Sequence, residues 1–131
     1  MHIKIYGAGS IGNHLANAAI NLNWKVDVYD LDPSALDRMK NDIYPSRYGK
    51  WDERISLFEN KQMKDIKYDY IFIGTPPDHH VELLLKSIEE NPKAILVEKP
   101  LCRPNSNDIN SIDKLNKIQM PIFIGYDHVV S

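Results

Sequence analysis

Residues 2–30 read HIKIYGAGSIGNHLANAAINLNWKVDVYD and contain the pattern that decides the fold. A short apolar run leads directly into the glycine-rich stretch GAGSIG, residues 7–12. Apolar residues then recur at helical spacing, and a second strand-like run, 24–29, ends at Asp30. The predicted order is strand, glycine turn, helix, strand and carboxylate. The apolar positions that we expect to face inward on the helix are Ile11, Leu15, Ala18, Ala19 and Leu22.

Each glycine of the turn has a mechanical reason to be there. Gly7 permits a sharp exit from a buried strand, Gly9 lets a pyrophosphate approach the backbone, and Gly12 lets the helix pack closely on the sheet. Ser10 and Ile11 lie in the first helical turn. The free N–H groups of this turn and the positive end of the helix dipole would face the phosphates of a ligand. The stretch therefore predicts a site for a dinucleotide. A glycine-rich turn without a ligand is the alternative.

Asp30 lies 18 residues beyond Gly12, near the distance expected of an acid that accepts hydrogen bonds from the adenosine ribose. A carboxylate there would repel a 2′-phosphate, so we expect NAD in preference to NADP. Asp32 is a rival ribose ligand. However, the pair Asp32-Pro33 is more typical of a helix N-cap followed by proline at the first helical position.

Composition restricts the class of protein. A chain of 131 residues is interpreted as one domain, 1–131. Its net charge is −2 and its Lys and Arg residues are scattered, so we expect no basic face that would bind nucleic acid. Its apolar runs are too short to cross a bilayer, and no signal peptide is recognised, so we expect a cytoplasmic protein. The single Cys102 excludes an intramolecular disulfide, and no acid or thiol set matches His79 and His80 as metal ligands.

The rest of the chain alternates strand-like runs with helical patterns. Residues 43–53 are interpreted as a connection, and Asn13 is placed with His14 on the solvated side of the first helix. The alternation predicts an α/β, doubly wound three-layer Rossmann fold with a mainly parallel sheet of about six strands in the order 3-2-1-4-5-6. Further strands are predicted at 54–58, 70–74, 94–97 and 121–126, and further helices at 33–40, 61–65, 81–88 and 109–115.

Three motifs occur in order along the chain. They are the glycine stretch at 7–12, TPPDHH at 75–80 and VEKPL at 97–101, and GYDH follows at 125–128. Together they closely resemble the nucleotide-binding half of the Gfo/Idh/MocA oxidoreductases, the group of glucose–fructose oxidoreductase and inositol dehydrogenase. The resemblance covers essentially the whole chain, and Glu-Lys-Pro after a predicted strand is its most specific part.

The resemblance implies an enzyme that uses NAD or NADP to oxidise or reduce a carbon, usually at a sugar, cyclitol or nucleotide-sugar hydroxyl. It implies that the glycine-motif residues hold the pyrophosphate and that Asp30 holds the ribose. Thr75 and Pro76 are implied to line the cofactor. His80 takes the position of the motif's histidine, and Glu98 is implied to contact the nicotinamide ribose region.

Lys99 matches the family's catalytic-site lysine, which is thought to orient the reacting hydroxyl and to stabilise charge as the proton leaves. The chemistry is reasonable, because a fixed ammonium stabilises negative charge on a carbinol oxygen where water is excluded. Partial burial beside a nicotinamide would also lower the lysine pKa toward a useful range. A solvated lysine at a strand end is the alternative.

The chain also departs from the family. Full-length members continue into a second α/β domain, which supplies the substrate pocket, the usual acid–base residues and most of the oligomer interface. No general base is identified here, so we expect the isolated chain to be inactive, with a sugar-like substrate bound only if a second domain completes it. The other hypothesis is a stand-alone dinucleotide-binding or regulatory module without catalysis. The oligomeric state stays open.

Overall fold

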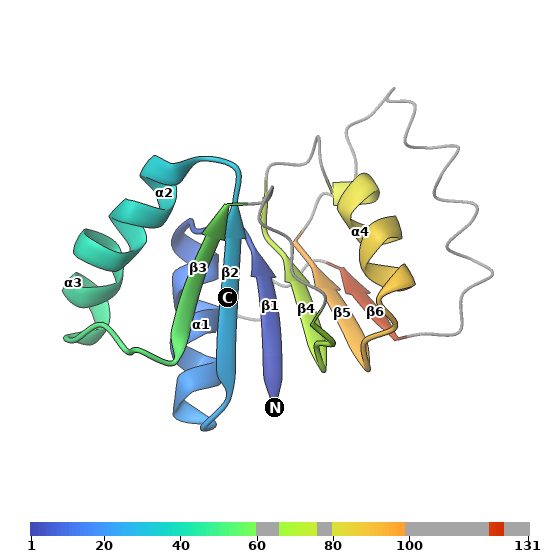
Figure 1. Cartoon of the computed structure of the whole chain (residues 1–131), viewed down its shortest axis with the longest axis horizontal. Helices are drawn as coiled ribbons and strands as arrows, with labels where there is room; N and C mark the ends of the chain where they lie inside the picture. Colours follow the sequence, from blue (N-terminus) through green and yellow to red (C-terminus); the bar gives the residue numbers. More distant parts are fainter. Residues whose placement is uncertain (60–65, 76–79, 99–120, 125–131) are drawn as a thin grey trace.

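One six-stranded parallel sheet organises the part of the chain that the computed structural model describes, residues 1–59, 66–75, 80–98 and 121–124. The strand order is β3-β2-β1-β4-β5-β6 and every neighbouring pair is parallel, which confirms the predicted doubly wound topology (Figure 1). The strands are β1 His2–Tyr6, β2 Lys25–Asp30, β3 Ile55–Glu59, β4 Tyr70–Ile73, β5 Ala94–Val97 and β6 Ile122–Ile124.

Helices pack on both faces of the sheet. Residues of α1, α2 and α3 share one buried cluster with β1, β2 and β3, whereas α4 shares a second cluster with β4 and β5 (Figure 1). The predicted helices 61–65 and 109–115 lie outside the described residues. The helical elements are α1 Ser10–Asn21, α2 Pro33–Arg38, the π-helix η1 Met39–Ile43, α3 Tyr44–Tyr48 and α4 His80–Glu89.

The pleat of β1 divides its side chains between the two clusters. Ile3 and Ile5 join the cluster under α1, and Tyr6 joins the cluster under α4. Successive side chains of a strand point to opposite faces, so a central strand covered on both sides is apolar at nearly every position. Lys4 is the exception, because it is fully buried on the α4 side.

The inward face of α1 differs from the predicted one. Its buried residues are Gly12, Asn13, Ala16, Ala19 and Ile20. Of the predicted inward positions only Ala19 is fully buried, and Leu22, past the helix end, is 59% exposed. Small residues at 12 and 16 let the helix approach the sheet closely, which shifts the buried stripe away from the larger side chains. The prediction that Asn13 faces solvent is wrong.

The interpretation of 43–53 as a connection is also wrong in its first half. Helical structure runs on from α2 through η1 and α3 to Tyr48, and Gly49 ends it with φ of 95°. Pro45 lies in the first turn of α3, where a missing N–H is tolerated. Met39, which the spacing of the predicted helix 33–40 turns inward with Ala35 and Leu36, is buried as expected. Tyr44 is also buried but lies five positions further on, the span of a π-helix hydrogen bond, so the usual helical spacing did not reveal it.

None of the helices in the described ranges combines the length and the hydropathy that a bilayer-spanning helix needs.

Candidate functional site

The glycine turn lies where β1 ends, between the ends of β2 and β4. The Gly7 N–H donates to the carbonyl of Tyr29 at 2.8 Å, and the Gly74 N–H donates to the carbonyl of Tyr6 at 2.8 Å. Gly7 has φ of +110°, and a Cβ there would lie 2.8 Å from the Gly74 carbonyl oxygen. Only glycine therefore fits this exit from the sheet.

Gly12 and Gly9 are glycines for different reasons. A Cβ on Gly12 would lie 2.1 Å from the carbonyl oxygen of Gly7, so the close approach of α1 to the turn requires a hydrogen there. A Cβ on Gly9 would meet no atom of the described residues within 4 Å, and its φ of −82° suits any residue. The fold makes no demand for glycine at position 9, and the space above the turn is open.

Asp30 ties the end of β2 to the turn. Its Oδ2 accepts a hydrogen bond from the Ala8 N–H at 3.0 Å, and its Oδ1 accepts one from the Asp32 N–H at 2.9 Å. Each carboxylate oxygen can accept a further bond, so a ribose hydroxyl can still be bound. Asp32 accepts a hydrogen bond from the Ser34 N–H at 2.9 Å and caps α2, as its sequence context predicts.

Asn13 is a residue of this site that the sequence analysis missed. It is fully buried, and its Nδ2 donates to the carbonyls of Ala8 at 3.1 Å and Gly9 at 2.7 Å. These bonds hold two peptide groups of the turn in one orientation. An asparagine in the first turn of the helix, within reach of loop carbonyls that need donors, was the available signal.

Arg47 is the second residue that was missed. From α3 its guanidinium donates to the carbonyl of Ser10 at 3.1 Å and to the Ser10 hydroxyl at 3.0 Å. Both residues are exposed. The error in the 43–53 region explains the omission, because a loop gave no reason to place Arg47 beside the first residue of α1.

Thr75, His80 and Glu98 lie along β4 and β5 at the same edge of the sheet. Thr75 follows β4, and its buried hydroxyl has no hydrogen-bond partner within the described ranges. The His80 ring, 1% exposed at the start of α4, contacts the Thr75 carbonyl through Nε2. The Glu98 N–H donates to the carbonyl of Ile73 at 2.9 Å, next to the end of β5.

The structure therefore brings most of the predicted residues to the carboxyl edge of the sheet, where open α/β sheets bind ligands. Pro76 and Lys99 lie outside the described residues, and so do His79 and Cys102. In the ranges that the structure covers, no group of three His, Cys, Asp or Glu side chains is placed to hold a metal ion.

These residues fit a dinucleotide. The space over Gly9 is open, the Asp30 carboxylate closes one side of the turn, and the Thr75 hydroxyl on the neighbouring strand has a hydrogen to donate. No side chain caps the N-terminus of α1, and its first turn holds no acid that would repel a phosphate.

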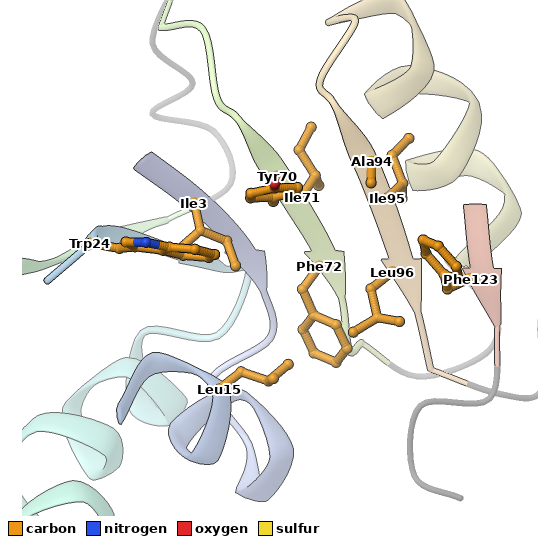
Figure 2. Close-up of a pocket in the computed structure, with 10 residues that line it drawn as sticks. All are labelled: Ile3, Leu15, Trp24, Tyr70, Ile71, Phe72, Ala94, Ile95, Leu96 and Phe123. Carbon is orange, nitrogen blue, oxygen red and sulfur yellow. The ribbon is translucent and has the colours of Figure 1, made fainter. Parts of the chain in front are cut away.

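A separate apolar hollow of about 280 Å³ lies on the α1 side of β1, β4, β5 and β6 (Figure 2). Leu15, Phe72 and Leu96 gather around it. The rings of Trp24 and Tyr70 stack there, with their centroids 5.4 Å apart. Phe123, which also lines the hollow, is 58% exposed. Its lining is aliphatic and aromatic, without the converging polar groups that a cofactor site needs. The hollow is not the candidate site.

Comparison with known proteins found a matching family model. The family model GFO_IDH_MocA, described as "Oxidoreductase family, NAD-binding Rossmann fold", matches residues 1–124. A comparison with curated proteins found no match.

Several solved structures share the fold. Myo-inositol 2-dehydrogenase from Lactobacillus plantarum aligns with a TM-score of 0.72 at 19% identity, over 100% of this chain and 38% of that one. The enzyme WbmG from Bordetella bronchiseptica, solved in complex with NAD, aligns with a TM-score of 0.63 at 14% identity, over 95% of this chain and 52% of that one. A Rex-family repressor, RSP, aligns with a TM-score of 0.60 at 14% identity, over 98% of this chain and 55% of that one. These likenesses show the fold, and this chain spans 38% of the length of the inositol dehydrogenase.

Proposed function

The chain belongs to the Gfo/Idh/MocA oxidoreductase family through its NAD-binding Rossmann fold, and from this premise we propose a specific role. It is the cofactor-binding domain of an oxidoreductase that transfers a hydride between a nicotinamide cofactor and a sugar, cyclitol or nucleotide-sugar hydroxyl. The likeness to an inositol dehydrogenase supports the choice of substrate class. A second domain supplies the substrate pocket, and the protein works in the cytoplasm.

The observation that carries this proposal is the open space above Gly9. Gly7 and Gly12 are required by close packing, whereas a Cβ at Gly9 would meet no atom within 4 Å in the part of the chain that the structure describes. A bound pyrophosphate accounts for the third glycine, because its oxygens must come near the backbone N–H groups of Ser10 and Ile11. Asn13 fixes the peptide groups on the inner side of the same turn.

The proposal includes a preference for NAD over NADP. Asp30 is held beside Ala8 by a 3.0 Å hydrogen bond, so its negative charge stays at the edge of the turn. A carboxylate there accepts hydrogen bonds from ribose hydroxyls and repels a 2′-phosphate. Selectivity then rests on one charged side chain.

The other half of the site is assigned to the ends of β4 and β5. Thr75 donates its hydroxyl hydrogen to the cofactor, and Pro76 lies against the cofactor. His80 holds the Thr75 carbonyl and so positions the strand end. Glu98, anchored by its N–H to β4, takes the nicotinamide ribose region.

Lys99 is assigned the catalytic role on the strength of its motif. When bound, the nicotinamide cofactor accepts or supplies the hydride. Loss of the hydroxyl proton builds negative charge on the carbinol oxygen until the hydride leaves its carbon and a neutral carbonyl forms. The Lys99 ammonium stabilises that charge and orients the hydroxyl. The general base belongs to the second domain.

The test substitutes Gly9→Ala and Gly12→Ala and measures both stability and NADH binding. The Gly9 variant should melt like wild type, because its methyl group meets no atom of the described residues, yet bind NADH about tenfold or more weakly, about 1.4 kcal/mol. The Gly12 variant should lose stability, because its methyl group would clash with the Gly7 carbonyl. A folded Gly9→Ala protein with unchanged NADH affinity would contradict the proposal.

Hydride transfer is tested in a protein that contains the substrate domain. NADH formation is followed on a panel of inositols, sugars and nucleotide sugars, with Lys99→Ala and Lys99→Met as variants. We expect turnover to be lost in both variants and NADH affinity to be retained. Full turnover in both variants would remove Lys99 from the chemistry.

A further inference from the structure

We propose that Arg47 is a phosphate-binding residue of the cofactor site, reaching from α3 to hold Ser10 and to supply positive charge to the pyrophosphate. The inference rests on the proposed function, because it adds a residue to the same site. Neither the motifs nor the family match assigns a role to this arginine.

The first step is the contact itself. The guanidinium donates from Nη1 to the Ser10 carbonyl at 3.1 Å and from Nη2 to the Ser10 hydroxyl at 3.0 Å. A guanidinium has five N–H donors, so three of those of Arg47 remain for other acceptors. The Ser10 oxygen accepts from Arg47, which leaves the serine's own hydrogen to be donated. Arg47 and Ser10 thus present adjacent donors at the first residue of α1.

The second step is the charge around the turn. Two carboxylates lie at the end of β2 and just beyond it: Asp30 accepts from the Ala8 N–H of the turn, and Asp32 caps α2. A pyrophosphate brings two further negative charges to the same edge. The positive end of the helix dipole supplies only about half an elementary charge. Arg47 contributes a full positive charge, in the planar form that binds phosphate oxygens in pairs.

The third step concerns the alternative, that Arg47 only fastens α3 to α1. The two helices already meet through Tyr44, which is 2% exposed and donates its hydroxyl hydrogen to the Asn17 side chain at 3.2 Å. Arg47 and Ser10 are both exposed, and exposed polar contacts contribute little to stability. The packing of α3 therefore does not depend on the arginine.

The experiment measures ADP-ribose and adenosine binding by calorimetry for wild type, Arg47→Ala, Arg47→Lys and Ser10→Ala. Arg54→Ala is the matched control, because Arg54, like Arg47, is an exposed arginine that donates hydrogen bonds to a neighbour. Its partner is Asp52, and it precedes β3 at the opposite edge of the sheet. Thermal unfolding is recorded for every variant, and titrations are repeated at two salt concentrations.

We expect Arg47→Ala to weaken ADP-ribose binding about tenfold or more, the size of a lost charged hydrogen bond, and to flatten its salt dependence. Adenosine, which lacks phosphate, should bind as it does to wild type. Ser10→Ala should lose a smaller part of the affinity, Arg47→Lys should recover part of it, and Arg54→Ala should change nothing. All variants should melt near the wild-type temperature.

Two results overturn the inference. One is an Arg47→Ala protein that binds ADP-ribose as wild type does, and the other is an equal loss for ADP-ribose and adenosine, which would indicate a change in the fold. A wild-type chain that binds neither ADP-ribose nor NADH would instead contradict the proposed function. The wild-type titration therefore separates the two failures.

Discussion

Asn13 stabilises the glycine turn from within the helix that follows it. Replacing it by Asp would set a carboxylate against the carbonyls of Ala8 and Gly9, which now accept hydrogen bonds at 3.1 and 2.7 Å. We expect Asn13→Asp to lower the free energy of unfolding by about 1–3 kcal/mol, because a buried polar group loses its partners. NADH affinity should fall as well.

Urea unfolding and NADH titration check this prediction. Asn21→Ala is the control, because Asn21 is exposed near the end of the same helix and should affect neither quantity. An Asn13→Asp protein as stable as the control would show that the two hydrogen bonds do not hold the turn.

Comparing NAD with NADP separates two roles of Asp30, its structural role in holding the turn and its proposed role in binding the ribose. Asp30→Ala removes the acceptor of the Ala8 N–H, a loss that is equal for both cofactors. For NAD it also removes a charge-assisted bond to ribose, about 1.5–3 kcal/mol, whereas for NADP it relieves a repulsion. NAD affinity should therefore fall more than NADP affinity.

Parallel calorimetric titrations with the two cofactors measure this difference. Asp37→Ala serves as the control, since Asp37 is exposed on α2 and bonds only locally, to Asn41. Equal losses for NAD and NADP would refute the ribose assignment and leave Asp30 a structural role.

Sequence predicted the positions in the candidate site that depend on backbone shape, and it missed two side chains that reach the glycine turn across space. Gly7, Gly12 and Asp30 lie where the pattern predicts. Asn13 looked like a solvated polar residue. Arg47 belongs to α3, which follows the π-helix η1, and η1 breaks the usual periodicity of the region. Neither contact could be predicted without the packing of α1 and α3.

At the scale of elements, β1 is joined to the end of α4 by an ion pair between the buried Lys4 and Glu90, which directly follows the helix and is partly exposed. The Lys4 Nζ donates to both carboxylate oxygens of Glu90, at 2.8 and 3.0 Å, and to the hydroxyl of Tyr6 at 3.0 Å. Burial lowers the pKa of Lys4, and the hydrogen bonds that its ammonium donates to Glu90 oppose that shift. The Lys4 ammonium is fully buried, so it depends on these partners for its charge.

Removing the acid should therefore cost more than removing the lysine. Glu90→Ala should lower the free energy of unfolding by about 3 kcal/mol, because it leaves an unpaired buried charge, whereas Lys4→Met should cost less. Denaturant unfolding of both variants and of the double variant tests the order, with exposed Glu89→Ala as control. A larger loss for Lys4→Met would contradict this account of the pair.

The elements differ in how well their patterns predicted them. β1, β2, β4 and β5 were predicted because strands buried on both faces are apolar over most of their length. In the 33–48 region the predicted helix 33–40, with its cap at Asp32, covers α2 and the first two residues of η1, whereas the helical structure that follows was not predicted. A short helix, a π turn and another short helix follow one another there, and the buried residues follow no single period.

The whole molecule should unfold more readily at high pH. Burial raises the pKa of Tyr6 above its ordinary value of 10.0, and burial with hydrogen bonds to Tyr29 and Asp27 raises the pKa of Tyr68. Above pH 10 the unfolded chain releases these protons first, so the folded state binds more protons and stability falls. Lys4 acts oppositely, but only below its ordinary pKa of 10.5.

Urea unfolding at about pH 8 and about pH 11 measures the change, with tyrosinate absorbance as a second readout. Tyr68→Phe should reduce the loss of stability between the two pH values. Lys25→Ala is the control, because Lys25 is exposed and its replacement leaves the buried tyrosines in place. It should not reduce the loss of stability. Ionisation of every tyrosine near pH 10 in the folded protein would contradict the prediction.

The order of the sheet was predictable because one glycine turn, placed after the first strand, sets the switch point of a doubly wound fold, and the same turn marks the candidate site. The substrate was not, because Lys99 lies outside the described residues and the chain spans 38% of the inositol dehydrogenase. The pocket that would recognise a sugar belongs, in our proposal, to the second domain.

Amide chemical shifts recorded during a titration with NADH test the central claim most directly. If the dinucleotide binds at the start of α1, the amides of Gly9, Ser10 and Ile11 should shift together, and those around the apolar hollow at Phe72 and Leu96 should stay unchanged. A folded chain whose glycine-turn amides do not move at saturating NADH, or whose shifts cluster at the hollow, would contradict the claim.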